Sequence, residues 1–349
     1  MPFYWHNSKW IKYATSVTPD NTGRIPPNSA IESTSTSVGT TPTPTPTPTP
    51  APDTVLPAGF TASQVGPLTF SEEFNSPLSA DRWKSYLWFQ PDLANLPDFE
   101  ISNGTLKIWN TKTGNVWNGG RAFNADGSDA DNGPTPRFAQ KYGFFEIECK
   151  MPIGVGNWPS FWLLARPGTR RPEIDIFEAY TGNNGFFNPT NFHVVGVDST
   201  IHDGPSGATT KIGNVRSFDT LGSIEMSTNF VKITCHWNSN GVFTFYLNGV
   251  SYGTVTAAGI DVPMWPIVAM GTTTGKTWTG LVYPDPSVDT PSSLANPFEV
   301  RSVRCWGLAN NAHIVVGSAV TKIDPTTPLL PTSTPTPTPV PTYAPVGAT

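Results

Sequence analysis

The sequence is poor in charge and in long apolar runs. Only 13% of its 349 residues are charged, about half the usual share, and the net charge is −5. A nucleic-acid binder would normally carry a basic patch, and a membrane helix needs about 18 consecutive apolar residues, which this chain does not offer. We therefore expect neither nucleic acid nor a membrane as a partner.

Cysteine is also scarce. The three cysteines, Cys149, Cys235 and Cys305, lie far apart in strand-like apolar segments, and their spacing fits no metal site. We expect buried free thiols rather than a disulfide. The first seven residues, MPFYWHN, contain no basic segment followed by an apolar core, so no secretory signal peptide is visible.

Aromatic residues and proline are plentiful instead. Aromatics reach 12% with 12 tryptophans, and a surface rich in tryptophan and poor in charge suits neutral, ring-shaped ligands. Threonine and proline alternate over residues 40–51 and again over 334–339. Such tracts favour extended spacers that cannot bury apolar surface, so they bound a folded unit.

These tracts divide the chain into four predicted parts. Residues 1–38 form a short N-terminal segment that could attach the protein to a larger assembly, and 39–54 form a Thr/Pro linker. Residues 55–308 form the catalytic domain and 309–349 a Thr/Pro-rich tail. We expect the Thr/Pro-rich flanks to be disordered.

The predicted domain reads as all-β. Short alternating runs at 105–109, 144–151 and 298–306 are bounded by Gly, Asn, Asp and Pro, and the runs 231–237 and 242–247 flank the turn NSNG, a hairpin signal. No segment sustains a 3.6-residue period. This pattern predicts a single β-sandwich or jelly roll.

The run EIDIFE at residues 173–178 places three carboxylates in six residues. On a strand, Glu173 and Asp175 point to the same face, whereas Glu178 has the wrong parity for it. One extra residue at a β-bulge near 176–177 would bring Glu178 into line. Two carboxyls about 5–5.5 Å apart fit a retaining glycosidase, and crowding would raise the pKa of the proton donor. A solvated acidic edge or a cation site is the alternative from this run alone.

The surrounding segments decide between these readings. Residues 141–146 (KYGFFE), 156–164 (GNWPSFWLL) and EIDIFE together resemble glycoside hydrolase family 16, which includes laminarinases, lichenases, agarases and carrageenases. The opening 70–75 (FSEEFN), the hairpin and the closing strand extend the resemblance over roughly the central part of the chain. The five-residue spacing of the two glutamates is similar to that of the bulged branch, with its laminarinases and agarases.

The resemblance implies a fold, a cleft and a mechanism. The fold would be a concanavalin A-like β-jelly-roll sandwich of two curved antiparallel sheets, with a sugar-binding cleft on the concave face. Glu173 matches the nucleophile and Glu178 the general acid/base, and Asp175 would hold their protonation states apart. The implied activity is that of an endo-acting retaining hydrolase of a β-linked polysaccharide, with β-1,3-glucan as the first expectation.

Other candidates for substrate binding are aromatic, basic or histidine residues near these motifs. Trp158 and Trp162 fit sugar-stacking or cleft-wall positions, although Trp162 suits the core equally well. His193 is expected on the strand beside the acidic one, within reach of an acid, and Arg121 at a turn on the cleft edge. Trp117 and Trp278 are weaker candidates for subsites.

The sequence leaves several alternatives open. A galactan such as agar or carrageenan, or a bacterial exopolysaccharide, is an alternative substrate, and a non-catalytic carbohydrate-binding module is an alternative class. Family members often hold a structural calcium ion with an acid in the last strand; here Arg301 is near that position, so we expect no cofactor. The expected location is extracellular or virion-associated.

Overall fold

The computed structural model describes residues 3–6, 9–12, 55–86, 98–113, 116–118, 122–124, 136–154, 156–165, 169–179, 193–205, 207–272 and 294–317. The chain divides into two units, residues 1–49 and 50–349. In the first unit, β1 (Phe3–His6) and β2 (Lys9–Lys12) pair as an antiparallel hairpin. The predicted Thr/Pro spacers lie outside the described residues.

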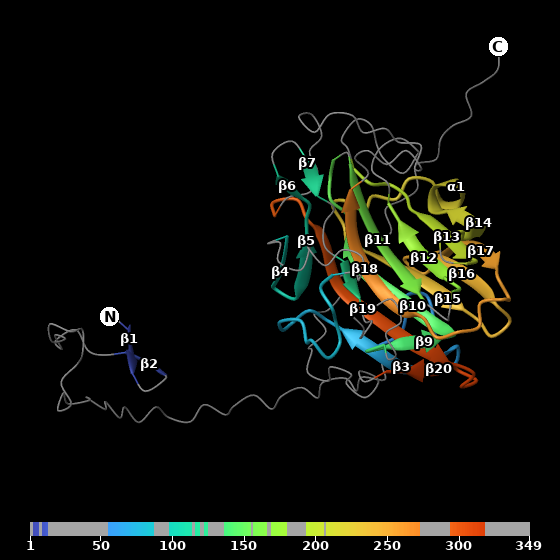
Figure 1. Ribbon diagram of the computed structural model, residues 1–349, viewed down its shortest axis with the longest axis horizontal. Coiled ribbons are helices and arrows are strands. Elements are labelled where there is room, and N and C mark those ends of the chain that lie inside the picture. Colours follow the sequence, from blue (N-terminus) through green and yellow to red (C-terminus); the bar gives the residue numbers. More distant parts are fainter. Residues whose placement is uncertain are drawn as a thin grey trace, which may run out of the picture. The chain divides into compact units, whose positions relative to one another are not determined.

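The second unit is built on two antiparallel sheets (Figure 1). The six-stranded sheet has the order β14-β13-β12-β11-β18-β8. Its strands in chain order are β8 (Ala122–Asn124), β11 (Asn157–Leu164), β12 (Glu173–Glu178), β13 (Asp198–Asp203), β14 (Thr210–Arg216) and β18 (Trp265–Thr272).

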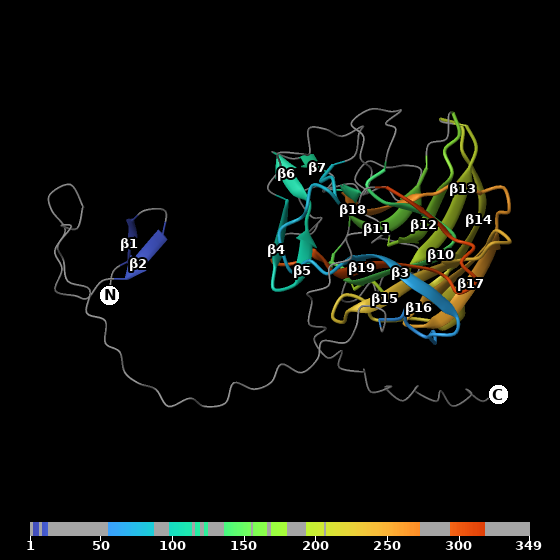
Figure 2. The same cartoon turned by 90° about the horizontal axis from the view of Figure 1, so that it is seen from below.

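The eight-stranded sheet has the order β17-β16-β15-β10-β19-β5-β4, and β3 also pairs with the long strand β19. Its strands in chain order are β3 (Val65–Glu72), β4 (Phe99–Ser102), β5 (Thr105–Ile108), β10 (Gly143–Lys150), β15 (Val231–Trp237), β16 (Val242–Leu247), β17 (Val250–Thr256) and β19 (Phe298–Leu308). In Figure 2 the six-stranded sheet lies above the eight-stranded one.

Short elements complete the unit. They are the hairpin of β6 (Thr111–Thr113) and β7 (Val116–Asn118), the pair of β9 (Ala139–Lys141) and β20 (Ile314–Val316), and the helix α1 (Ser217–Leu221). Because β20 pairs with β9, the folded part continues past the predicted boundary at residue 308. Within the described residues, no helix is long and apolar enough to cross a membrane.

The core lies between the sheets, where alternate side chains of each strand point inward. Phe161 and Leu163 of β11 are fully buried there, as are Phe145 and Ile147 of β10. Burial of this apolar surface is the main favourable term for such a sandwich. Cys149, Cys235 and Cys305 are free and buried in the same core, which confirms the expectation for the cysteines.

The predicted all-β fold of two antiparallel sheets is therefore confirmed, together with most of its strands. The expected hairpin appears as β15 and β16, with Trp237 opposite Phe243. Its turn requires a left-handed residue, which Gly241 supplies with a φ of 72°. Adding a Cβ at Gly241 would also place it 2.4 Å from the backbone of Ala258.

Candidate active site

The three acids of EIDIFE lie on β12, near the middle of the six-stranded sheet. Against β11, Glu178 is opposite Ser160, Phe177 opposite Phe161, and Asp175 opposite Trp162. Ile176 has no partner in this register and is the extra residue of a β-bulge. The same irregularity appears against β13, between Asp175 and Glu178.

The bulge brings Glu178 to the same face as Glu173 and Asp175, which a regular strand would not do. Ile174 and Phe177 are fully buried in the core, so the carboxylates on either side of them point to the outer face of the sheet. Glu173, Asp175 and Glu178 therefore form one row along that face. The bulge stands where the spacing of the acids predicted it.

Crowding and burial perturb these acids. Glu173 is partly exposed to solvent. The protein packed around its carboxylate nevertheless desolvates that group and raises its pKa from 4.5 to about 7. Burial raises the pKa of Asp175 well above its usual value, and the negative charges of Glu178, Glu173 and Asp198 raise it further. These effects favour the protonated form of Asp175, in which the carboxyl group can donate a hydrogen bond.

Two neighbouring side chains approach the acids. The Nε1–H of Trp158 donates to Oε1 of Glu178 at 3.1 Å, which ties the indole of β11 to the last acid of β12. Nε2 of His202 lies 3.6 Å from Oδ2 of Asp175, too far for a hydrogen bond. Burial, and then the charge of Lys211, lower the pKa of His202, whereas burial raises the pKa of Asp175, so both shifts disfavour an ion pair between the two side chains.

Strand β13 contributes residues that the sequence did not single out. His202 is opposite Glu173 and Asp198 is opposite Glu178, so both lie beside the row of acids. Burial raises the pKa of Asp198 as well. The alternation of DSTIHD at 198–203 offered a signal for this strand, but its register against β12 could not be read from the sequence.

His193 is not on the strand beside β12, and that expectation was wrong. The neighbouring strand is β13, which begins at Asp198. Nδ1 of His193 lies 2.8 Å from Oε2 of Glu225, an acid outside β12.

The structure describes Trp162, but it does not describe the side chains of the remaining sequence candidates. Trp162 is partly buried, lies opposite Asp175 and packs against the core. Arg121 and Trp278 lie outside the described residues, and of Trp117 only the backbone in β7 is described.

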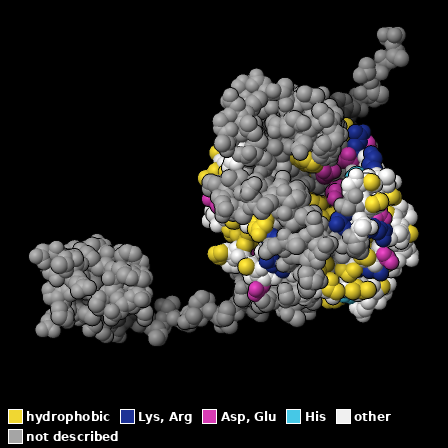
Figure 3. Space-filling view, viewed as in Figure 1, with side chains coloured by type: hydrophobic (Ala, Val, Ile, Leu, Met, Phe, Trp, Pro, Cys, Tyr) yellow, Lys and Arg dark blue, Asp and Glu magenta, His cyan; other side chains and the backbone are white. Residues whose placement is uncertain are grey.

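Figure 3 shows acidic and basic side chains next to one another over β12 to β14.

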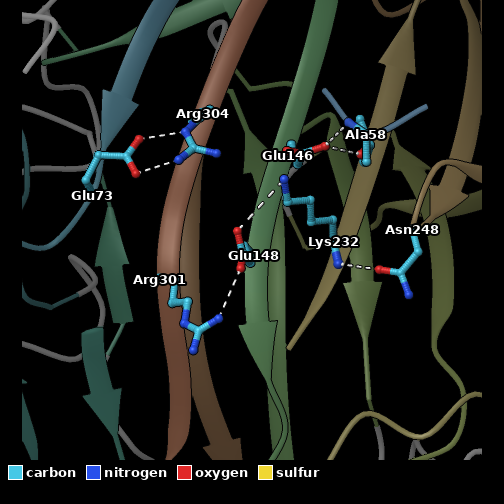
Figure 4. Close-up of polar contacts among 9 residues, drawn as sticks. Ala58, Glu73, Glu146, Glu148, Lys232, Asn248, Arg301 and Arg304 are labelled. Carbon is cyan, nitrogen blue, oxygen red and sulfur yellow. Dashed lines mark hydrogen bonds and ion pairs between the residues drawn. The ribbon is translucent and has the colours of Figure 1, made fainter. Parts of the chain in front are cut away.

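Charged side chains on the outer face of the eight-stranded sheet pair with one another. Arg304 of β19 forms two hydrogen bonds of 2.6 Å to the carboxylate of Glu73, and Nη1 of Arg301 lies 3.4 Å from Oε1 of Glu148 (Figure 4). The guanidinium group of Arg301 also stacks at 3.5 Å over the ring of Phe230. The two guanidinium groups place positive charge on this face, where the sequence led us to expect no calcium ion. Among the described residues, no cluster of three or more His, Cys, Asp or Glu could hold a metal.

Comparison with known proteins is consistent with this geometry. The chain is 26% identical over 245 residues to the endo-1,3-1,4-beta-glycanase EglC of Rhizobium meliloti (strain 1021), with 61% of this chain and 48% of the relative covered. It is 22% identical over 261 residues to the keratan-sulfate endo-1,4-beta-galactosidase of Sphingobacterium multivorum, with 69% and 55% covered. The chain thus spans about half the length of these relatives.

The fold is shared with solved structures. The laminarinase catalytic domain of Thermotoga maritima MSB8 matches with a TM-score of 0.50 and 20% identity, over 70% of this chain and 98% of that domain. This likeness identifies the jelly-roll fold. The profile of the family described as glycosyl hydrolases family 16 matches residues 101–290, more than half of the chain. The chain therefore belongs to family 16 of the glycosyl hydrolases.

Proposed function

We propose that this protein is an endo-acting retaining glycoside hydrolase that cleaves a β-linked polysaccharide. The observation that carries the proposal is the bulge of β12, which aligns Glu173, Asp175 and Glu178 on one sheet face. Three acids in one partly desolvated row cannot all ionise at low cost. Different protonation states within one site are what a nucleophile and a proton donor require.

The proposed mechanism assigns one role to each acid. Glu173, once ionised, attacks the anomeric carbon while Glu178 protonates the leaving glycosidic oxygen. Glu178 then removes a proton from water, which releases the sugar from Glu173 with its original configuration. Protonated Asp175 donates to the nucleophile and so keeps a third negative charge out of the site. The indole N–H of Trp158 orients Glu178.

A β-1,3-glucan of the laminarin type is the first proposed substrate. The endo-1,3-1,4-beta-glycanase relative supports a β-glucan, whereas the endo-1,4-beta-galactosidase relative supports a galactan. Agar, carrageenan or a bacterial exopolysaccharide is therefore the second candidate. We further propose that the protein acts outside the cell or on a virion, with residues 1–38 as its attachment segment.

The test is a reducing-end assay against laminarin, mixed-linkage glucan, agarose, carrageenan and bacterial exopolysaccharides. We expect release from one polymer, abolished by Glu173→Gln and by Glu178→Gln. Glu100→Gln is the matched control, because Glu100 is an acid on β4 of the other sheet. Proton NMR of the fresh digest should show the β-anomer first.

Two results would overturn the proposal. An α-anomer as first product would exclude retention. Binding to one polymer with no release from any would identify a carbohydrate-binding module. The presence of both glutamates argues against that module, because a binding protein has no need for a paired nucleophile and acid.

A further inference from the structure

The register of β12, β13 and β14 builds three rows of side chains across the sheet. Each row begins at one of the three acids of β12, crosses β13 and ends on β14. The rows are Glu173–His202–Lys211, Asp175–Thr200–Asn214 and Glu178–Asp198–Arg216. Two of the three rows therefore end in a basic residue.

Several observations place these β14 side chains on the same face as the acids. Nδ2 of Asn214 donates to Oδ1 of Asp198 at 3.3 Å. Burial raises the pKa of Asp198 and lowers that of His202, and the charge of Lys211 acts downward on both, as a cation close to both would. Gly213, one of the alternate residues of β14, instead faces the side chain of Val255 on β17.

The two basic residues differ in how they are neutralised. Arg216 forms hydrogen bonds of 2.9 and 3.0 Å to the carboxylate of Asp219, so its charge is already paired. Lys211 is exposed, and within the described part of the chain it forms no ion pair or hydrogen bond. Its ammonium group is therefore available to bind an anionic ligand beside the row of acids.

The other half of the sheet has a different character. Across β11 and β18, Trp158 lies opposite Gly271, and Ser160 opposite Ala269. This side presents an indole and small side chains, which suit the face of an uncharged sugar ring. Among the described residues, β11 and β18 carry no charged side chain, whereas β13 and β14 do.

We propose that the β14 side of this sheet face is a subsite for a sugar that carries an anionic substituent, with Lys211 as the partner of that substituent. Lys211 is two strands from Glu173, about 10 Å between Cα atoms, which is close to the length of a disaccharide. The inference rests on the proposed hydrolase and, of its two substrate candidates, favours an acidic galactan or exopolysaccharide over neutral laminarin. Either a carboxylate or a sulfate would satisfy the ammonium group.

Affinity electrophoresis of the full chain tests this proposal without requiring cleavage. The Glu173→Gln protein is run in native gels containing laminarin, carboxymethylated laminarin or sulfated laminarin, and in gels containing agarose or κ-carrageenan. We expect tighter binding to the modified laminarins than to laminarin, or to κ-carrageenan than to agarose. Comparison of the gels with carboxymethylated and sulfated laminarin identifies the substituent. The added variant Lys211→Gln should weaken that binding about fivefold, as the loss of a charge pair of about 1 kcal/mol would.

Two further variants and a salt series control the test. Lys107→Gln removes the same charge from β5 in the other sheet and should retain the preference for anionic polymers. Lys211→Arg keeps the positive charge at residue 211 and should retain that preference too. Thermal unfolding of each variant separates loss of binding from loss of fold. Raising the salt concentration should reduce the preference, because exposed charges are screened.

The outcomes separate this proposal from the hydrolase itself. Equal binding to neutral and anionic polymers, no binding to any of them, or a preference unchanged by Lys211→Gln would each overturn it. Cleavage of a neutral polymer by the unmodified protein would then leave the hydrolase standing. Lys211-dependent binding to an anionic polymer with no cleavage would support the subsite and refute the hydrolase.

Discussion

Replacing Glu173 with glutamine should stabilise the folded protein at pH 8 while it abolishes hydrolysis. Desolvation raises the pKa of Glu173 from 4.5 to about 7, so ionising this carboxyl costs more in the folded than in the unfolded chain. At 1.36 kcal/mol per pKa unit, the difference corresponds to about 3 kcal/mol. Glutamine has nearly the same shape and never ionises.

The sign of the effect depends on pH. Below pH 4.5 the carboxyl is protonated in both states, and Glu173→Gln should have little effect. As the pH rises through about 7, the folded protein with glutamate loses stability that the variant retains. The variant should therefore unfold with a free energy up to about 3 kcal/mol higher at pH 8, or roughly 6 °C in Tm.

Urea unfolding at pH 4 and pH 8 measures this difference. Glu100→Gln is a control of opposite sign, because Lys107 and Ser102 lower the pKa of Glu100, and its loss should slightly destabilise the protein at pH 8. The same shift predicts an acidic limb of kcat/KM near pH 7, since Glu173 must ionise to attack. A Glu173→Gln protein that is equally or less stable than the parent at pH 8 would refute the reasoning.

Three further predictions concern the neighbours of the acids and the opposite sheet. Trp158→Phe keeps a ring but removes the N–H donor to Glu178, so kcat/KM on the best polymer should fall about tenfold; an unchanged value would exclude an orienting role. Arg304→Met leaves the buried carboxylate of Glu73 without its ion-pair partner and with the hydrogen bond from Ser71, and should cost about 3–5 kcal/mol in urea unfolding; a loss below 1 kcal/mol would contradict this. EDTA should leave Tm unchanged, because Arg301 and Arg304 repel a cation. A drop in Tm that added calcium reverses would show that the protein binds a stabilising calcium ion.

Local patterns accounted for much of the fold. Alternating apolar residues and turn signals predicted the hairpin of β15 and β16 and the long strand β19, because both depend on residues near in sequence. The spacing of Glu173, Asp175 and Glu178 predicted the bulge for the same reason. Strand parity is a local property, and one extra residue is the simplest way to restore it.

Residues that meet only through strand pairing were missed. His193 was expected beside the acids, but the structure places His202 and Asp198 there, and Lys211 one strand further. Their positions follow from the register of β12 to β14, which the long-range packing of the two sheets fixes.

The sequence by itself thus determined that the protein is an all-β sandwich, and it predicted the bulge that aligns the three acids of β12. Strand alternation, turns and the EIDIFE spacing act over a few residues. Only the tertiary structure decided which side chains surround those acids, because the neighbours of β12 come from segments tens of residues away. That pairing also decided the distribution of charge across the site, with acids on β12 and basic residues at the β14 edge.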